Sequence, residues 1–365
     1  MKIILATGIY PPEIGGPATY VHALAGEFAS AGQEVVVVTY EAISGKRLAI
    51  SDGDKKASSN VMTVPRFGGP LLRWWRYARV LKREGHGADI VYAFSSVSCG
   101  VPVMLARLKK PKKILRLGGD FFWERYTDRG GMLGLREWYG RHRLVDSFTR
   151  FFVQRILRAF DHIVFSTRFE EEIYEQAYRL PAHSVIENAV PSGASVTHTK
   201  HEPFRLLFMG RFVSFKNLPA LLAAVALLPD VRLTLVGSGP MEAQLRALAG
   251  ERVQFLPPAH GTEKQKMFAE HDLLVIPSLT ELSPNVALEA RAAGLLILLT
   301  EETGLSERLA QGMVLADLSS PERIAEEIRQ MRTEYDALVR AAASVPPERG
   351  WADVSREHLS LFARL

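Results

Sequence analysis

The chain of 365 residues contains one cysteine, Cys99, and no apolar run that approaches the ~20 residues needed by a membrane-spanning helix. A lone cysteine excludes a disulfide framework and a cysteine zinc site, and it is typical of proteins in reducing compartments. The N-terminal stretch, residues 1–7, is too short and too soon interrupted for a secretory signal peptide. We therefore expect a cytoplasmic protein, with attachment to the inner face of a membrane left open.

The sequence also lacks the usual marks of metal and triad chemistry. No histidine pair has zinc-ligand spacing, and no set of serine, histidine and aspartate can be assigned as a catalytic triad. Asp52 and Asp54 match an Asp-x-Asp metal motif only superficially, because they lie in a polar loop that continues into two lysines. We expect no bound metal ion.

What is present is the composition of a folded globular protein. Apolar residues make up 47% of the chain, and 365 residues suit two α/β domains better than one. Residues 1–192 contain 27 Lys and Arg against 19 Asp and Glu, whereas the whole chain carries +5, so the remainder is mildly acidic. This asymmetry favours different partners for the two halves.

Apolar runs alternate with helical patterns from end to end, which predicts parallel sheets with helices on both faces. The pattern restarts after residues 189–196, a stretch with the proline, serine and glycine of a linker. The sequence therefore predicts an α/β protein of two tandem doubly wound domains, 1–192 and 193–349. Strands are expected at residues 3–7, 34–39, 90–93, 113–117 and 162–166, and then at 206–209, 232–236, 273–277, 295–299 and 313–316.

Two glutamates, Glu281 and Glu289, flank the junction between a predicted strand and a predicted helix over 285–294. Glu281 falls in the loop at the strand's carboxyl end, where open α/β sheets bind ligands. Glu289 lies about one turn inside the helix. Carboxylates accept hydrogen bonds from paired hydroxyl groups, in which sugars are rich. Considered alone, the pair is also compatible with an ordinary turn whose glutamates are solvated.

Arg211 and Lys216 follow the first strand of the second half, just before a predicted helix. The arginine fork and the mobile lysine charge both suit phosphate oxygens near a helix N-terminus. As an isolated pattern they are equally compatible with a solvated basic loop.

Glycine pairs follow two further strands. Gly237 and Gly239 invite a dinucleotide-turn interpretation, which we reject because Glu242 stands where that motif has its third glycine. Gly15 and Gly16 come after the first strand, where a glycine backbone can approach a ligand closely. A tight turn without a ligand is the alternative for the second pair.

Together these segments resemble the retaining GT-B glycosyltransferases of family 4, also called glycosyl transferase group 1. The resemblance covers nearly the whole chain, is strongest over residues 204–310 and is weakest over 41–88. It implies two Rossmann-like domains facing a cleft, with a last helix, 350–365, that crosses back onto the first domain. It also implies that domain closure excludes water from the site.

The resemblance implies a role for each motif. Arg211 and Lys216 would neutralise the diphosphate of a UDP- or GDP-sugar, Glu281 would bind the sugar hydroxyls, and Glu289 would bind the ribose. The donor is a substrate, and no separate cofactor is implied. The remaining donor-site residues implied by the resemblance are Gly15, Gly16, Gly237, Gly239, Ser283, Pro284 and Asn285.

The chain departs from the family in places that bear on the chemistry. Asp120 stands where many relatives carry a histidine, and we predict that it orients or deprotonates the acceptor hydroxyl. A turn-forming aspartate is the alternative. Leu295 replaces a usual proline, and residues 302–304, Glu-Thr-Gly, replace a usual Gly-Gly pair, which puts the identity of the sugar in doubt.

Basic residues gather in the first half. Helical spacing over 72–83 places Arg73, Arg76, Arg79 and Arg83 on one side and bulky groups, among them Leu72, Trp75 and Leu81, mostly on the other. Such a helix suits an anionic membrane surface, although a core-packing helix with a solvated face fits equally well. No nucleic-acid-binding module is present, so we expect no nucleic-acid partner. A second basic cluster is formed by Lys109, Lys110, Lys112, Lys113 and Arg116.

We therefore predict a retaining glycosyltransferase that moves a hexose-type sugar from a nucleotide sugar to a saccharide or lipid-linked acceptor. Its catalytic residues would be Glu281, Asp120, Arg211 and Lys216. Two alternatives stay open: a GT-B nucleotide-sugar epimerase, and a non-catalytic protein that binds sugar nucleotides.

Overall fold

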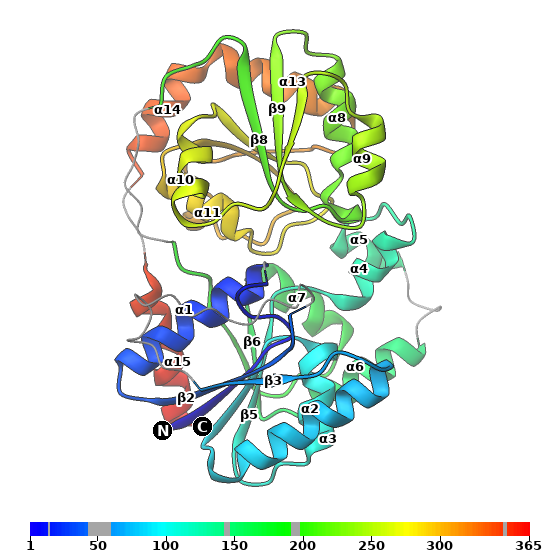
Figure 1. Cartoon of the computed structure of the whole chain (residues 1–365), viewed down its shortest axis with the longest axis vertical. Helices are drawn as coiled ribbons and strands as arrows, with labels where there is room; N and C mark the ends of the chain where they lie inside the picture. Colours follow the sequence, from blue (N-terminus) through cyan, green and yellow to red (C-terminus); the bar gives the residue numbers. More distant parts are fainter. Residues whose placement is uncertain (14, 43–59, 142–146, 191–197, 346–348) are drawn as a thin grey trace. The chain divides into compact units, whose positions relative to one another are not determined.

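The computed structural model describes residues 1–13, 15–42, 60–141, 147–190, 198–345 and 349–365. The chain forms two compact units (Figure 1). The first contains Met1–Phe121, Arg141–Ala189 and Arg349–Leu365, and the second contains Phe122–Gly140 and Val190–Glu348. The second unit thus includes a segment, 122–140, that a division at residue 192 places in the first domain. Asp52 and Asp54, and most of the expected linker, lie outside the described residues.

The first unit is built on a seven-stranded sheet in the order β3-β2-β1-β4-β5-β6-β7, with every neighbouring pair parallel. Its order reverses at β1, so β1 and β4 are central, as in doubly wound folds. The strands are β1 (Lys2–Ala6), β2 (Glu34–Tyr40), β3 (Asn60–Val64), β4 (Ile90–Ala93), β5 (Lys112–Leu117), β6 (His162–Phe165) and β7 (His183–Val185).

Helices cover this sheet because each buries one apolar stripe. In α1, Val21, Leu24 and Phe28 are buried at the spacing of one helix face, and Gly32 follows with a positive φ of 75°. The helices of the first unit are α1 (Gly16–Ser30), α2 (Pro70–Glu84), α3 (Val101–Ala106), α6 (Ser147–Leu157), α7 (Arg168–Ala177) and α15 (Trp351–Arg364).

The second unit has a six-stranded parallel sheet in the order β10-β9-β8-β11-β12-β13. Its strands are β8 (Phe204–Arg211), β9 (Val231–Ser238), β10 (Val253–Leu256), β11 (Leu273–Ile276), β12 (Leu296–Thr300) and β13 (Val314–Ala316). Its helices are α4 (Phe121–Asp128), α5 (Leu135–Arg141), α8 (Leu218–Ala226), α9 (Glu242–Leu248), α10 (Gly261–Ala269), α11 (Asn285–Ala292), α12 (Glu307–Ala310), α13 (Pro321–Thr333) and α14 (Tyr335–Ala343).

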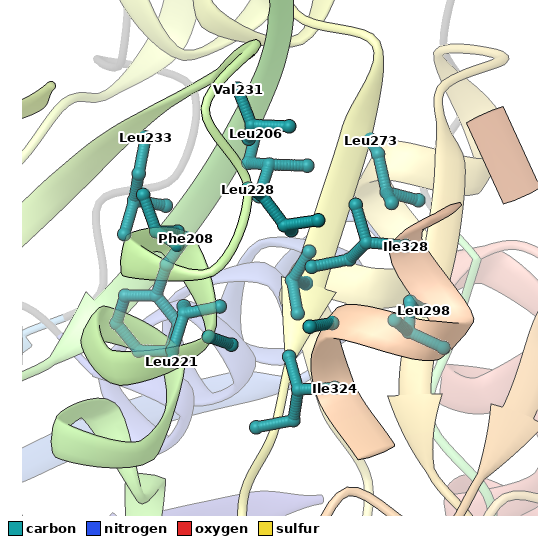
Figure 2. Packing of buried hydrophobic residues seen from close by; sticks show 14 of the residues in the cluster. Leu206, Phe208, Leu221, Leu228, Val231, Leu233, Leu273, Leu298, Ile324 and Ile328 are labelled. Atoms are coloured by element: carbon teal, nitrogen blue, oxygen red, sulfur yellow. The ribbon is translucent and has the colours of Figure 1, made fainter. Parts of the chain in front are cut away.

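One face of this second sheet forms a continuous apolar core. Figure 2 shows Phe208 of β8 beside Leu221 of α8, with Leu206 of β8 and with Ile324 and Ile328 of α13 in the same cluster. All five side chains are nearly or wholly buried. Because burial of one such side chain is worth roughly 1.5–3 kcal/mol, this core fixes the positions of β8 and its neighbours.

The fold is the predicted one, two α/β units with parallel sheets, and all ten predicted strands are present with ends shifted by at most two residues. The strands that the sequence did not reveal are β3, β7 and β10, and each lies at the edge of its sheet. Edge strands are less enclosed, so their sequences carry shorter and weaker apolar runs.

The last helix, α15, belongs to the first unit, where it packs against α1. His358 of α15 is fully buried, and its Nε2 lies 2.8 Å from the hydroxyl of Tyr20. Its Nδ1 lies 3.4 Å from the hydroxyl of Tyr92. Burial lowers the pKa of His358 well below its usual value, and the charges of Arg116 and Arg349 lower it further.

We predict that His358 makes the protein sensitive to acid. The folded state holds this imidazole neutral while the unfolded chain binds a proton, so stability is lost as pH falls below about 6.5. The proton bound by this one group in the unfolded chain lowers the free energy of unfolding by up to about 1.4 kcal/mol for each pH unit of acidification. Melting temperatures measured between pH 7 and 5 should fall less for His358→Gln than for the wild type.

The exposed His86 supplies a control, because His86→Gln should follow the wild-type profile. An equally steep fall in the His358→Gln variant would show that this histidine is not responsible.

Candidate functional site

The turn after β8 places the predicted basic pair at the carboxyl edge of the second sheet. Arg211 ends β8 and is half exposed, whereas the next residue, Phe212, is buried and anchors the turn. Lys216 ends a short 3₁₀ turn, and Asn217 then adopts a left-handed conformation with φ of 52°. The Asn217 side chain donates to the backbone oxygen of Leu318 at 3.3 Å, which holds this conformation.

The glycines after β9 are required by a close backbone contact. A Cβ atom on Gly237 would lie 1.9 Å from the backbone oxygen of Gly210, and one on Gly239 would lie 2.4 Å from that of Phe212. Gly237 also has a φ of 152°. These glycines therefore let the turn after β9 pack directly on the turn that carries Arg211. Their predicted place beside a nucleotide remains a prediction.

Glu281 follows β11 and is brought to Lys216. The Lys216 ammonium forms an ion pair with Glu281 Oε1, which also accepts a hydrogen bond from Ser278 Oγ. The backbone of Glu281 is fixed as well, because its N–H donates to the oxygen of Glu302 at 3.0 Å and its oxygen accepts from Gly304 N–H at 2.7 Å. The predicted lysine and glutamate thus form one partly buried, oriented ion pair.

Glu289 lies on α11, one turn from its start, and forms an ion pair with Lys264 of α10. Sequence reasoning missed Lys264, although it follows closely on the loop after β10. The first turn of α11 has no side-chain cap after Pro284. Ser283 Oγ is buried without a hydrogen-bond partner among the described residues. Asn285 begins the helix.

Glu302, one of the departures from the family pattern, holds the 122–140 segment. Its Oε1 accepts from the Thr280 hydroxyl at 2.8 Å and from the Arg136 N–H at 3.2 Å. Thr280 Oγ1 in turn accepts from the Leu135 N–H at 2.8 Å. A Cβ on Gly134 would lie 1.9 Å from Glu302 Oε2, so this glycine makes room for the carboxylate.

The same segment also reaches the basic turn. The Trp123 ring lies 5.3 Å from the ring of Phe215, and the Glu124 carboxylate lies 3.8 Å from the Arg211 guanidinium. Residues 122–140 therefore contact both loops that carry the predicted donor residues. No motif in the sequence distinguishes Glu124, and the prediction omitted it.

In the first unit, the predicted glycine loop precedes α1. Gly15 is the N-cap residue and Gly16 begins the helix, and no side chain caps it. The loop is fastened by Arg66, which forms an ion pair with Glu13 at 2.6 Å and donates to the backbone oxygen of Gly8 at 3.0 Å. Arg66 is another functional candidate that the sequence did not reveal, because no motif surrounds it.

Asp120 lies in a polar cluster at the carboxyl ends of β5 and β6 in the first unit. It is only 2% exposed, and its Oδ2 accepts from the Tyr174 hydroxyl at 2.8 Å. Glu170, one helical turn before Tyr174 on α7, is fully buried beside it, with Ser166 Oγ 3.4 Å from its Oε2. Glu170 Oε1 has no hydrogen-bond partner among the described residues.

Arg116 belongs to the same cluster and not to the molecular surface. Its guanidinium donates to the backbone oxygen of Ile186 at 3.0 Å and to the Asn188 side chain at 2.7 Å, and it lies 4.1 Å from the centre of the Tyr20 ring. The prediction that Arg116 contributes to a surface basic cluster is wrong, because a buried arginine here satisfies buried oxygen atoms.

The arrangement of α2 also differs from its prediction. Leu81 is buried as expected, but Leu72 and Trp75 are exposed, Trp75 by 53%, on the side that carries the arginines. The Arg79 guanidinium lies 4.7 Å from the centre of the Trp75 ring, and Arg76 lies over the exposed ring of Phe67. Arginine and aromatic groups are therefore interleaved on one exposed surface.

A hollow of about 710 Å³ lies elsewhere in the second unit, against β9, β10 and α10. It is lined by Arg205, Thr234, Arg252 and His271 among others, and by none of the predicted site residues. Arg205 is at the opposite end of β8 from Arg211. The hollow therefore plays no part in the candidate site.

Two family models match the chain. Residues 14–193 match the family model described as Glycosyltransferase Family 4, and residues 203–334 match the model described as Glycosyl transferases group 1. The chain belongs to this glycosyltransferase family. Since the two models together span most of the chain, glycosyltransferase activity is assigned to the protein as a whole.

Individual relatives share less than a third of their residues with this chain. The chain is 28% identical over 345 residues to a D-inositol 3-phosphate glycosyltransferase of Arthrobacter sp. (strain FB24), covering 82% of this chain and 77% of the relative. Its fold is similar to sucrose-phosphate synthase from Thermosynechococcus elongatus, with a TM-score of 0.80, 18% identity and coverage of 100% and 98%. It is also similar to Anabaena HepE in complex with UDP and glucose, with a TM-score of 0.74, 15% identity and full coverage of both chains. The GT-B fold predicted from the sequence is confirmed.

Among the described residues, no helix has both the length and the apolar character to cross a membrane. In the same part of the chain, no three histidine, cysteine, aspartate or glutamate side chains gather as ligands of a metal ion.

The cluster around Asp120 yields a prediction about pH and stability. The pKa of Glu170 is raised to about 8, chiefly by burial and also by the neighbouring charge of Asp120. The positive charge of Arg116 acts in the opposite direction. The folded state therefore retains a proton that the unfolded chain releases near pH 4.5, so stability is lost as pH rises from there to about 8. Glu170→Gln should remove this loss, which reaches about 1.4 kcal/mol per pH unit.

The measurement is the melting temperature at several pH values between 5 and 8.5. The melting temperature of Glu170→Gln should rise relative to that of the wild type as pH increases. Glu322→Gln changes an exposed glutamate of the second unit, and its melting temperature should differ from that of the wild type by the same amount at every pH. A constant difference between Glu170→Gln and the wild type across this range would contradict the assignment.

Proposed function

We propose that the protein transfers a hexose-type sugar from a nucleoside diphosphate sugar to a saccharide or lipid-linked acceptor with retention of anomeric configuration. The observation that carries this proposal is the convergence of Arg211 with the Lys216–Glu281 and Lys264–Glu289 pairs at one sheet edge. Cations and hydroxyl-binding carboxylates in one place suit a ligand that is both a phosphate and a sugar. HepE, of similar fold, was crystallised with UDP and glucose, which supports this ligand class.

In this proposal the second unit binds the donor. Arg211 and Lys216 hold the diphosphate, aided by the uncapped start of α11 and by Ser283 Oγ. Glu281 accepts hydrogen bonds from the sugar hydroxyls, and Glu289 accepts them from the ribose. The cations stabilise the negative charge that develops as the bond from the anomeric carbon to the phosphate oxygen breaks.

The acceptor hydroxyl then forms the new bond to the anomeric carbon on the same face. Its proton passes to an oxygen of the departing phosphate, so no separate oxidant or metal hydroxide is needed to balance the step. Asp120, held by the Tyr174 hydroxyl, orients the acceptor hydroxyl in this scheme. Unchanged turnover in Asp120→Asn would remove Asp120 from the chemistry.

The first test is thermal stabilisation by a panel of UDP- and GDP-sugars. A bound donor should raise the melting temperature by several degrees at 100 times its Kd, because it binds only the folded state, an effect of about 2.7 kcal/mol. Glu289→Ala should abolish the shift. Glu270→Ala, which removes an exposed carboxylate paired with Lys266 at the end of α10, should keep it.

The active donor is then incubated with saccharide acceptors and with D-inositol 3-phosphate, the compound in the relative's name. A glycosylated product with retained configuration supports the proposal. Isomerised nucleotide sugar without acceptor would identify an epimerase instead, and binding without any turnover would identify a non-catalytic binder.

We further propose that the lipid-linked acceptor is met at an anionic membrane surface through α2. The support is the interleaved exposed surface of Phe67, Leu71, Trp75, Arg76 and Arg79. Apolar and aromatic groups enter the headgroup layer, and each basic residue near anionic lipid is worth about 1 kcal/mol.

Binding to phosphatidylglycerol liposomes at low salt should weaken about fivefold in Arg79→Ala and further in Trp75→Ala. Arg356→Ala, which removes an exposed arginine of α15, should bind like the wild type. If the wild type fails to bind these liposomes, the membrane proposal is wrong while the donor proposal stands.

A further inference from the structure

Each cation of the proposed donor site already has a carboxylate partner within the second unit. Lys216 pairs with Glu281, and Lys264 pairs with Glu289, and both glutamates are themselves expected donor ligands. The partner of Arg211 is different, because Glu124 has no hydroxyl-binding role in the proposed mechanism. Glu124 is a negative charge beside Arg211, which is proposed to bind a negatively charged diphosphate, so its presence there requires an explanation.

Glu124 is held near Arg211 by the packing of its segment. The neighbouring Trp123 ring packs on Phe215 within the basic turn, and its indole N–H donates to the backbone oxygen of Leu133 at 2.9 Å. Further along the segment, the Leu135 N–H is bound by Thr280. The segment is thus attached at both ends to the loops of the donor site, so the position of Glu124 is part of the site's construction.

The charges show what this carboxylate does to an anionic ligand. Without a ligand, the positive charges of Arg211 and Lys216 are balanced by Glu124 and Glu281. The bridging diphosphate of a sugar donor brings two negative charges. The nucleoside diphosphate released after transfer has a terminal phosphate with a second ionisation near pH 6, so it carries almost one charge more. Glu124 therefore repels the product more strongly than the donor.

We propose that Glu124 is a specificity-determining residue that competes with the diphosphate for Arg211 and weakens binding of the released nucleoside diphosphate more than that of the sugar donor. Its effect is to favour product release. The inference rests on the proposed function, because it requires that Arg211 binds the diphosphate.

The experiment is calorimetric titration of the full-length protein with UDP, with GDP and with the stabilising nucleotide sugar. Glu124→Gln should bind the matching nucleoside diphosphate about two- to fivefold more tightly, as expected for one charge at a partly exposed site. The gain for the nucleotide sugar should be smaller. Both gains should shrink at about 0.5 M salt, where exposed charges are screened.

Glu242→Gln is the matched control. Glu242 and Glu124 have the same 35% side-chain exposure, and each has an arginine partner, Arg246 in the case of Glu242. The control should leave all affinities unchanged. Should Glu124→Gln fail to fold, as judged by its melting curve, Glu124→Ala takes its place in the titrations.

Three results would overturn the inference: no gain in affinity for the nucleoside diphosphate, an equal gain for donor and product, or a gain that persists at high salt. Arg211→Ala separates this failure from failure of the proposed function. If Arg211→Ala weakens nucleoside diphosphate binding and Glu124→Gln changes nothing, only the inference falls. If Arg211→Ala binds UDP and GDP like the wild type, the assignment of the diphosphate to Arg211 falls with it.

Discussion

The partly buried ion pair between Lys216 and Glu281 is the interaction on which the second unit's site depends. A buried charge is costly unless it is paired and hydrogen-bonded, so loss of Lys216 would leave the buried carboxylate of Glu281 without its cation. The pair joins the turns after β8 and β11, two strands that are neighbours in the sheet. Ser278 Oγ donates to the Glu281 carboxylate, and the Glu281 N–H donates to the backbone oxygen of Glu302. The loops that carry these residues are therefore all connected to the ion pair.

Much of this arrangement can be predicted from the sequence because the central strands are strongly apolar and their following loops carry motifs. Glu281 and Lys216 were assigned to one sheet edge on that basis, and the structure brings them together. Lys264, Arg66 and Glu124 could not be found in the same way, because each lies on a segment without a motif and acquires its partner only through tertiary packing. Three of the four edge strands, β3, β7 and β10, were missed for a related reason, since their apolar runs are short.

Charge is the property that sequence patterns describe least well here. A run of basic residues indicated a surface cluster, yet Arg116 is buried among oxygen atoms of the first unit. On α2 the arginines and the exposed aromatic rings share one side of the helix, although spacing had separated them. Whether a charged side chain faces water depends on what packs beside it, and one-dimensional spacing contains no information about that neighbour.

Residues 122–140 belong to the second unit, although the chain on both sides of them belongs to the first, so the enzyme cannot be separated into its two units by one cut. Together with α15, this segment means that neither unit consists of one uninterrupted stretch of chain. A hybrid enzyme joined at residue 192 would take residues 122–140 from one parent and take from the other the loops of Thr280 and Glu302, which hydrogen-bond to that segment. Such a hybrid keeps these contacts only where the residues from the two parents match across the junction.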